Sequence, residues 1–381
     1  MNAYGRPSGP TLAAGRCLAA LFAICCSIGC LSPRSGHPSS TDRESYRPTL
    51  SIPSSPGPVI VDTPRGDDDR EIVLPASQVE TWIVHTRACE QSMGSNPWPA
   101  INVGRLDEQG GPLRAVEPEG LLSRMTGRPT VFLIHGYGYT HKVAVEETIQ
   151  VRAQLETLGG LGPDHLFVMF DWPSERAIPG LIRDLNEKAR RSRIAGYHLA
   201  RFLQAAPEGS RVCLLGQSDG GRVALTSLHL LSGSVLPEFG REPSAQLSSG
   251  RADLRLRAVA LEAAIEHDWL NPGDRLGGAL PISEAFLNLY NSRDSALSVY
   301  ALGQYTGFGA ALGRVGFKRR DLERLGPLRD RVEQIDIHPM AGSDHSLYTR
   351  ALTFPIVAGR VADFASWREL DRHGPIGFPE P

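Results

Sequence analysis

The sequence predicts an α/β fold in which a mainly parallel sheet is covered by helices on both faces. From about residue 76 onward, short apolar runs alternate with helical stretches. Several runs, among them Thr130–Ile134 and Leu166–Phe170, are apolar at nearly every position, which is typical of strands buried on both faces of a sheet. A strand followed by a helix, repeated along the chain, favours parallel pairing of the strands.

About eight strands are expected. They are Glu80–His85, Leu113–Val116, Thr130–Ile134, Leu166–Phe170, Val212–Leu215, Ala258–Leu261, Ala285–Tyr290 and Val332–Ile337. The main helices between them are expected at Gly180–Ala205 and Gly221–Leu231. No internal repeat is found, so the simplest organisation is one domain over residues 76–381.

Composition and charge exclude some classes of protein. The chain has 381 residues, of which 41% are hydrophobic and 22% are charged, as in ordinary globular proteins. A net charge of −2 and a pI near 6.6 argue against a nucleic-acid partner. Beyond the first thirty residues only Cys89 and Cys213 remain, and they form neither a disulfide framework nor a metal-ligand pattern. A bridge between these two cysteines stays possible, and we expect no metal or other cofactor.

The first thirty residues are typical of an export signal. Arg6 and Arg16 precede the apolar stretch Leu18–Ile28. At about eleven residues the stretch is too short to cross a bilayer as a stable helix, but it fits the apolar region of a signal peptide. We therefore expect residues 1–30 to be a signal peptide and the protein to be exported.

The end of this segment, Ser27-Ile28-Gly29-Cys30, resembles the lipobox of bacterial lipoproteins, with Ser27 in place of the usual leucine. The resemblance implies that Cys30 is acylated and becomes the first residue after cleavage. The protein would then be held by this lipid at a membrane face of the cell envelope. Cys25 or Cys26 could serve instead, and an ordinary secretory peptide cut nearby is the alternative.

Residues 31–75 are rich in proline, serine and glycine and contain a charged run, Arg65–Arg70. No apolar periodicity is present, so this segment cannot bury enough surface to offset its chain entropy. We expect it to be a disordered, flexible tether between the lipidated cysteine and the globular domain.

A nucleophile motif follows the strand at Val212–Leu215. Gly216-Gln217-Ser218-Asp219-Gly220 has the pattern G-x-S-x-G, and a helix follows it. The sharp strand-to-helix turn forces the serine into a strained conformation, so its neighbours two positions away must be small. The turn exposes the Ser218 hydroxyl above the sheet and places the next backbone N–H at a helix N-terminus. A chance serine in a glycine-rich turn is the alternative.

A serine hydroxyl needs a base to accept its proton, and in this arrangement the base is a histidine that follows the acid in the chain. His338, His345 and His373 lie beyond the last strands. His345 lies in the loop after the final strand, from which a side chain can reach the serine. His338 ends that strand and is expected to be structural. We therefore expect His345 to be the general base.

An acid must orient the histidine and stabilise its charged form. Asp294 follows the strand that ends at Tyr290, at the edge of the sheet where a triad acid is needed. It could instead cap the helix that begins near Ser295. Glu262, directly after the strand Ala258–Leu261, is the reserve candidate for the acid.

The strand Thr130–Ile134 runs into His135-Gly136-Tyr137, a sequence typical of an oxyanion loop. We expect the backbone N–H groups of Tyr137 and Asp219 to be the two oxyanion donors. His135 is expected to hold the loop.

These motifs together resemble the α/β-hydrolase superfamily, most closely a poorly characterised bacterial branch of esterase- and lipase-like enzymes. The resemblance is carried by Val131–Gly136, Asp171–Ser174, Gly216–Gly220, Asn291–Asp294 and Asp344–Ser346, which span about residues 130–348. It implies the α/β-hydrolase fold. In related proteins, this strand-to-helix turn, the nucleophile elbow (Gly216–Gly220 here), carries an apolar residue after the serine. This chain has Asp219 instead, whose carboxylate is unfavourable beside a developing oxyanion unless it points away.

The function expected from these residues is hydrolysis of a carboxylic ester by a Ser218–Asp294–His345 triad through an acyl-enzyme. The substrate would be a small molecule or lipid with an acyl group. Two alternatives stay open: hydrolysis of another acyl bond such as a thioester or amide, and a catalytically silent lipoprotein that uses the fold for binding. Dehalogenase chemistry is disfavoured because the nucleophile position holds serine, not aspartate.

Overall fold

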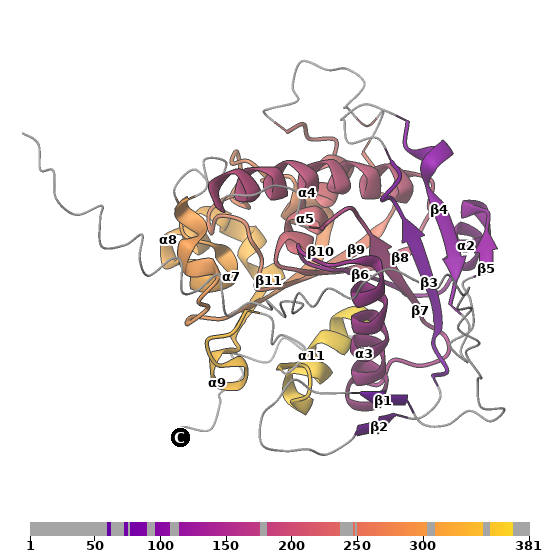
Figure 1. The fold of residues 1–381 in the computed structure, drawn as a ribbon. Coiled ribbons are helices and arrows are strands. Elements are labelled where there is room, and N and C mark those ends of the chain that lie inside the picture. Colours follow the sequence, from indigo (N-terminus) through magenta and orange to yellow (C-terminus); the bar gives the residue numbers. More distant parts are fainter. Residues whose placement is uncertain are drawn as a thin grey trace, which may run out of the picture. The chain divides into compact units, whose positions relative to one another are not determined.

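The computed structural model describes residues 59–61, 72–74, 77–89, 96–106, 114–175, 181–236, 247, 250–302, 309–345 and 351–368. The chain divides after Ser54, and all described residues belong to the second unit, Ser55–Pro381 (Figure 1). The predicted signal peptide, residues 1–30, and the predicted lipidation site Cys30 lie outside the described residues.

A sheet of nine strands runs through the described part of the second unit, in the order β11-β10-β9-β8-β6-β7-β3-β4-β5. The strands are β3 (Glu80–His85), β4 (Asn102–Arg105), β5 (Arg114–Val116), β6 (Thr130–Ile134), β7 (Leu166–Asp171), β8 (Arg211–Gln217), β9 (Arg255–Leu261), β10 (Ser283–Tyr290) and β11 (Val332–Asp336). The seven neighbouring strands from β11 to β3 in this order pair in parallel. In this sheet only the pairs β3–β4 and β4–β5 are antiparallel. The predicted mainly parallel sheet is confirmed.

One strand of the nine-stranded sheet was not predicted. β4 reads Asn-Val-Gly-Arg, with both ends exposed and only Val103 and Gly104 buried. A single large apolar side chain gives no detectable periodicity. The strand forms because its backbone pairs antiparallel with β3 on one side and with β5 on the other.

Two short strands are described within residues 31–75, the segment that the sequence predicts to be a tether. β1 (Val59–Val61) and β2 (Ile72–Leu74) pair antiparallel in a separate two-stranded sheet. Both triplets consist of β-branched or leucine residues, which favour extended backbone, whereas the proline- and serine-rich composition around them dominated the prediction.

Helices cover both faces of the large sheet. α4 (Leu181–Gln204) and α5 (Asp219–Leu231) lie on one face, and α3 (His141–Gly159) and α11 (Pro355–Ala365) lie on the other (Figure 1). Shorter helical segments are η1 (Trp98–Ala100), α2 (Pro118–Arg124), α6 (Ala279–Ile282), η4 (Leu297–Leu302), α7 (Leu312–Val315), α8 (Arg319–Leu325), η6 (Gly326–Arg331) and α9 (His338–Ala341). Among the described helices, none is both long enough and apolar enough to span a membrane.

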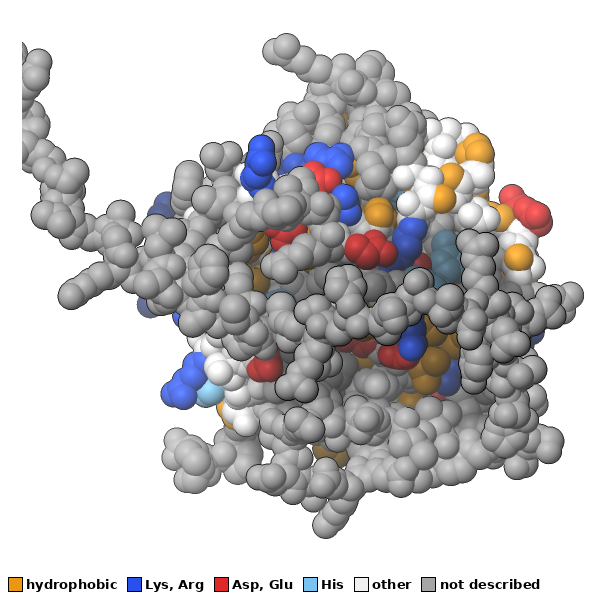
Figure 2. Space-filling model, in the orientation of Figure 1, with side chains coloured by type: hydrophobic (Ala, Val, Ile, Leu, Met, Phe, Trp, Pro, Cys, Tyr) orange, Lys and Arg blue, Asp and Glu red, His pale blue; other side chains and the backbone are white. Residues whose placement is uncertain are grey.

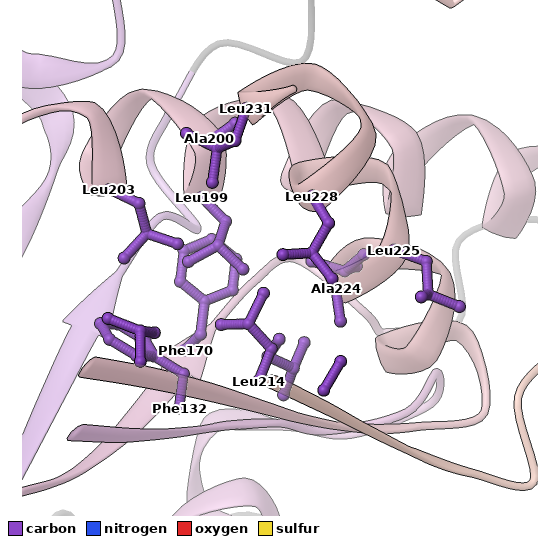
Figure 3. Packing of buried hydrophobic residues seen from close by; sticks show 14 of the residues in the cluster. Phe132, Phe170, Leu199, Ala200, Leu203, Leu214, Ala224, Leu225, Leu228 and Leu231 are labelled. Atoms are coloured by element: carbon purple, nitrogen blue, oxygen red, sulfur yellow. The ribbon is translucent and has the colours of Figure 1, made fainter. Parts of the chain in front are cut away.

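The core is divided by the sheet into two apolar layers. On β6, Phe132 and Ile134 belong to the layer that contains α4 and α5, whereas Val131 and Leu133 belong to the layer that contains α3 and α11. Figure 3 shows Phe132, Phe170 and Leu214 of the strands against side chains of α4 and α5. Because each face is covered, a central strand needs apolar residues at every position, and each large side chain buried in this way contributes about 1.5–3 kcal/mol.

The remaining sequence expectations concern cysteine and charge. Cys89 and Cys213 are both free and buried, so they do not form the bridge that the sequence left open. Among the coloured side chains in Figure 2, Lys and Arg lie beside Asp and Glu. This mixture agrees with the small net charge of the chain, −2.

Parallel strands end at a common edge, and the residues that follow them therefore meet there. Ser218 follows β8, Glu262 follows β9, and Asn291 follows β10. His135 follows β6, and Asp171 is the last residue of β7. Because the polar residues singled out by the sequence stand at these strand ends, the edge is where a site is expected in a sheet of this kind.

Candidate active site

Ser218 occupies a strained turn between β8 and α5. Its backbone has φ 53° and ψ −118°, a positive φ that is uncommon for a residue other than glycine. A Cβ on Gly216 would lie 2.5 Å from the carbonyl oxygen of Gly220, and a Cβ on Gly220 would lie 2.1 Å from the carbonyl oxygen of Ile134. The turn is therefore strained as predicted, and it requires glycine at both positions. Ser218 is nearly buried, with 8% of its surface exposed.

His345 reaches Ser218 from the loop that follows the last strand. Its Nε2 lies 2.8 Å from Ser218 Oγ, and its Nδ1 lies 2.6 Å from Asp294 Oδ2. The loop is held in place where Ser295 N donates to the carbonyl oxygen of Ser343. The structure thus brings together the three residues predicted as a triad, with the imidazole between the hydroxyl and the carboxylate.

Asp294 performs both tasks that the sequence offered as alternatives. Its side chain is fully buried, and Oδ1 accepts a hydrogen bond of 2.8 Å from Leu297 N at the start of η4. Its other oxygen, Oδ2, accepts from His345. Because each oxygen has its own donor, the carboxylate cannot rotate freely, and the capping bond fixes the orientation that His345 needs.

The sequence suggested that His338 ends the last strand, but the structure does not place it there. The strand stops at Asp336, and His338 begins the short helix α9. The cause is Asp336, whose carboxylate caps the turn by accepting from His338 N at 3.0 Å. His338 Nδ1 lies 3.2 Å from the carbonyl oxygen of Gly342, so its predicted structural role fits its contacts.

Glu262, the reserve candidate for the acid, is also at the site. Its Oε2 lies 3.8 Å from His345 Nδ1, beyond hydrogen-bond range, while Oε1 accepts from Asn291 Nδ2 at 3.0 Å. Burial raises the pKa of Glu262 to about 8, although the neighbouring His345 opposes this shift. At neutral pH this carboxyl is therefore protonated, and Asp294 is the carboxylate that bonds the imidazole.

The backbone of Glu262 is itself strained, with φ 48°. Gly313 packs directly on it, since a Cβ on that glycine would lie 2.1 Å from the Glu262 carbonyl carbon. Strained residues of this kind persist where surrounding contacts hold them, and they concentrate at functional sites. The sequence signal for Glu262 was its place directly after an apolar strand.

The oxyanion loop lies against the elbow. A Cβ on Gly136 would lie 2.0 Å from Gln217 Oε1 and 3.4 Å from Ser218 Cβ, so a larger residue would require the Gln217 side chain to move. Tyr137, the first predicted donor, is held at its hydroxyl, which donates to Asp184 Oδ1 at 2.7 Å. Asp219, the second predicted donor, is the first residue of α5, where backbone N–H groups point outward with the helix dipole.

His135 is structural in its contacts, as expected. Its ring is stacked on Trp172 at 5.8 Å between centroids, and Trp172 Nε1 donates to the His135 carbonyl oxygen at 2.9 Å. His135 Nε2 lies 3.3 Å from Asp171 Oδ1. These contacts tie the oxyanion loop to the end of β7.

The charge of Asp219, unfavourable beside an oxyanion, is neutralised by a residue that the sequence analysis missed. Arg222 Nη1 lies 3.1 Å from Asp219 Oδ1, and both side chains are buried. Arg222 also donates to the carbonyl oxygen of Ala264 and to Tyr300 Oη. The i,i+3 spacing of Asp219 and Arg222 on a predicted helix was the available signal.

The pKa of His345 is set by opposing effects. Burial lowers it, but the hydrogen bond and charge of Asp294, with the charge of Asp219, raise it to about 9. The imidazole is therefore held largely in its protonated form at neutral pH. A base of this kind becomes more available as the pH rises, which has consequences for activity.

Comparison with known proteins agrees with this fold. Residues 119–237, which include the oxyanion loop and the elbow, match a family model described as an alpha/beta hydrolase of unknown function. The protein is a member of the α/β-hydrolase superfamily. A comparison with curated proteins found no match.

Solved structures of low similarity accompany that match. An inhibited esterase B from Lactobacillus rhamnosis is 13% identical, covers 77% of this chain and 90% of its own, and has a TM-score of 0.38. TT1662 from Thermus thermophilus is 15% identical, covers 74% and 95%, and has a TM-score of 0.34. A lipase-esterase related protein from Clostridium acetobutylicum is 12% identical, covers 62% and 95%, and has a TM-score of 0.30.

Proposed function

We propose that this α/β hydrolase is a serine hydrolase that cleaves carboxylic esters. The observation that carries the proposal is the continuous hydrogen-bonded path from Ser218 Oγ through His345 to Asp294, with contacts of 2.8 and 2.6 Å. A base within hydrogen-bond reach of a hydroxyl, and itself oriented by a buried carboxylate, is the arrangement that makes serine nucleophilic.

The reaction begins when Ser218 Oγ attacks the ester carbonyl carbon and His345 Nε2 takes its proton. The negative charge that forms on the carbonyl oxygen is stabilised by the backbone N–H groups of Tyr137 and Asp219. The bond to the alcohol oxygen then breaks, and His345 gives the proton to that oxygen. An ester between Ser218 and the acyl group remains on the enzyme.

Water completes the cycle. His345 removes a proton from a water molecule, whose oxygen attacks the acyl carbon of the Ser218 ester. When the intermediate collapses, the bond to Ser218 Oγ breaks and the proton returns from His345 to the serine. Throughout, Asp294 keeps Nδ1 protonated and stabilises the imidazolium without itself taking a proton.

Labelling with a fluorophosphonate probe tests for the activated serine without knowledge of the substrate. Wild-type protein should be labelled, and Ser218→Ala and His345→Ala should not be. Ser227→Ala is the matched control, because Ser227 is a buried serine on the same helix, α5, and should leave labelling unchanged. Absence of labelling in folded wild-type protein would overturn the proposal in favour of a silent binding scaffold.

Assays with different substrates then show which type of acyl bond the enzyme cleaves. Hydrolysis of a short p-nitrophenyl ester, lost in Ser218→Ala with an unchanged thermal transition, is expected. A labelled enzyme that cleaves only the matched thioester or amide would keep the serine mechanism and refute the ester specificity.

We also propose, from the sequence alone, that the protein is exported and held at a membrane by a lipid on Cys30. The wild-type protein should partition into detergent, and Cys30→Ser should be released into the soluble exported fraction. Cys25→Ser is the matched control and should partition as the wild type does. Equal partitioning of wild type and Cys30→Ser would remove the lipid anchor and leave export intact.

A further inference from the structure

A second group of histidines and a carboxylate lies beside the oxyanion loop, outside the triad. At its centre is Asp171, the fully buried last residue of β7. His85, at the end of the adjacent parallel strand β3, pairs with Asp171 in register, and His141 is the first residue of α3. Three separate elements thus bring their polar side chains to one point.

Two imidazoles point the same type of atom at one carboxylate oxygen. His85 Nδ1 lies 3.0 Å and His141 Nδ1 lies 2.9 Å from Asp171 Oδ2, and all three atoms lie within 4.8 Å of one another. The two rings are 5.0 Å apart between centroids. The side chains of His85 and His141 are 25% and 41% exposed, so the group opens to solvent on the side of the imidazoles.

The other oxygen of Asp171 is held separately. Its Oδ1 accepts from Arg87 Nε at 2.7 Å and lies 3.3 Å from His135 Nε2. Arg87 in turn forms an ion pair with Glu175. Burial would raise the pKa of Asp171, but the hydrogen bonds from His135 and His85 and the charge of Arg87 hold it well below its usual range. Asp171 is therefore a fixed, ionised carboxylate.

We propose that His85, His141 and Asp171 form a binding site for a divalent transition-metal ion, Zn²⁺ in the first place. Two neutral imidazoles and one carboxylate are a donor set that suits zinc, and a water molecule would complete four-coordination. Arg87 and His135 on Oδ1 match the outer hydrogen bonds that normally orient a ligating carboxylate. The carboxylates of Asp171 and Glu175 and the guanidinium of Arg87 together carry a net negative charge, which attracts the cation.

The two distances from Nδ1 to Asp171 Oδ2 need only a small change for zinc to bind. Zinc ligands at about 2.0–2.2 Å from the ion in tetrahedral geometry stand about 3.4 Å from one another, some 0.4 Å more than the present contacts. At present each Nδ1 carries the proton that it donates to Asp171 Oδ2, since a carboxylate can only accept. The ion replaces these two protons. A neutral imidazole then carries its proton on Nε2, and a protonated one releases a proton to solvent.

Zinc binding to the full-length chain, purified in detergent and stripped with a chelator, tests the proposal by titration calorimetry. We expect one ion per chain. His141→Gln and His85→Gln should weaken binding at least about 100-fold, since even the loss of an outer-shell partner costs 10–100-fold. Glutamine can still donate a hydrogen bond to Asp171, so these variants should keep the wild-type thermal transition without zinc. Zinc should raise the transition temperature of the wild type only.

Two further histidine variants locate the ion. The side chains of Glu262, Asp294 and His345 also lie close enough to hold a cation. His345→Ala should therefore bind zinc as the wild type does, and so should His338→Ala, which removes a partly exposed histidine outside both groups. No zinc binding by the wild type, binding that persists in both glutamine variants, or binding lost only in His345→Ala would overturn the proposal. None of these readouts depends on esterase activity.

Discussion

Replacing Asp294 with asparagine should inactivate the enzyme through the wrong imidazole tautomer. The two carboxylate oxygens have different donors, Leu297 N on Oδ1 and His345 Nδ1 on Oδ2. Asparagine has one oxygen. If that oxygen keeps the bond to Leu297 N, the amide NH₂ faces His345 and donates to Nδ1. The proton of the neutral ring then moves to Nε2, which can no longer accept the Ser218 proton.

The opposite orientation of the amide is disfavoured. It would turn NH₂ toward Leu297 N, leaving two donors face to face in a buried position, at a cost of about 1–3 kcal/mol. That cost leaves the productive orientation with roughly 15% to less than 1% of the population. Loss of the charge that stabilises the imidazolium adds to this, and asparagine in place of a triad aspartate typically lowers kcat about 10⁴-fold. We expect a fall of about 10³- to 10⁴-fold in kcat with KM little changed.

The assay is p-nitrophenyl ester hydrolysis together with thermal unfolding. Asp294→Asn should unfold near the wild-type temperature because it keeps the bond to Leu297 N. Asp336→Asn is the matched control. That carboxylate lies at the end of the neighbouring strand β11 and accepts from Ser292 N and His338 N, not from His345, so activity should persist. Activity of Asp294→Asn within tenfold of the wild type would refute the role of Asp294.

Three further outcomes follow from the same contacts. Because the pKa of His345 is raised to about 9, kcat/KM should increase with pH through the range 7–9. Asp219→Asn should shift this rise in kcat/KM to lower pH. A rise centred near pH 6.5 in the wild type would contradict this prediction. Glu262→Gln mimics the protonated acid and should keep activity at pH 7 within a few-fold, which a rate assay checks. Gly220→Ala should lower the free energy of unfolding by about 3 kcal/mol or more, measured in urea, whereas Gly359→Ala, with open space around it, should not.

The sequence predicted the parallel sheet and that Ser218, Asp294 and His345 would lie together, because both are encoded locally. A strand covered on both faces must be apolar throughout, and polar residues that begin directly after such a strand must lie at the sheet edge. Asp294 was identified by that rule, Ser218 by the G-x-S-x-G motif between a strand and a helix, and His345 by its place in the loop after the last strand. The four-residue strand β4 was not predicted, because its pairing with β3 and β5, and not its own residues, makes it a strand.

Contacts between distant segments could not be predicted in the same way. His85, His141 and Asp171 are separated by up to 86 residues, and no spacing rule relates them. The sequence expectation of no metal rested on the absence of a local ligand pattern, which says nothing about ligands drawn from three elements. Only the register of β3 with β7 and the start of α3 bring these side chains to one carboxylate oxygen.

The carboxylate of Asp219 shows how a feature that is unfavourable in sequence becomes tolerable in structure. A buried charge beside the nucleophile would oppose formation of the oxyanion, but Arg222, one turn along α5, pairs with it. The same carboxylate raises the pKa of His345, so it favours the imidazolium that forms when Ser218 loses its proton. Its removal would leave Arg222 buried without that partner, at a cost of about 3–5 kcal/mol. The pair therefore couples the stability of the elbow to the protonation of the base, which local sequence reasoning on either residue alone could not reveal.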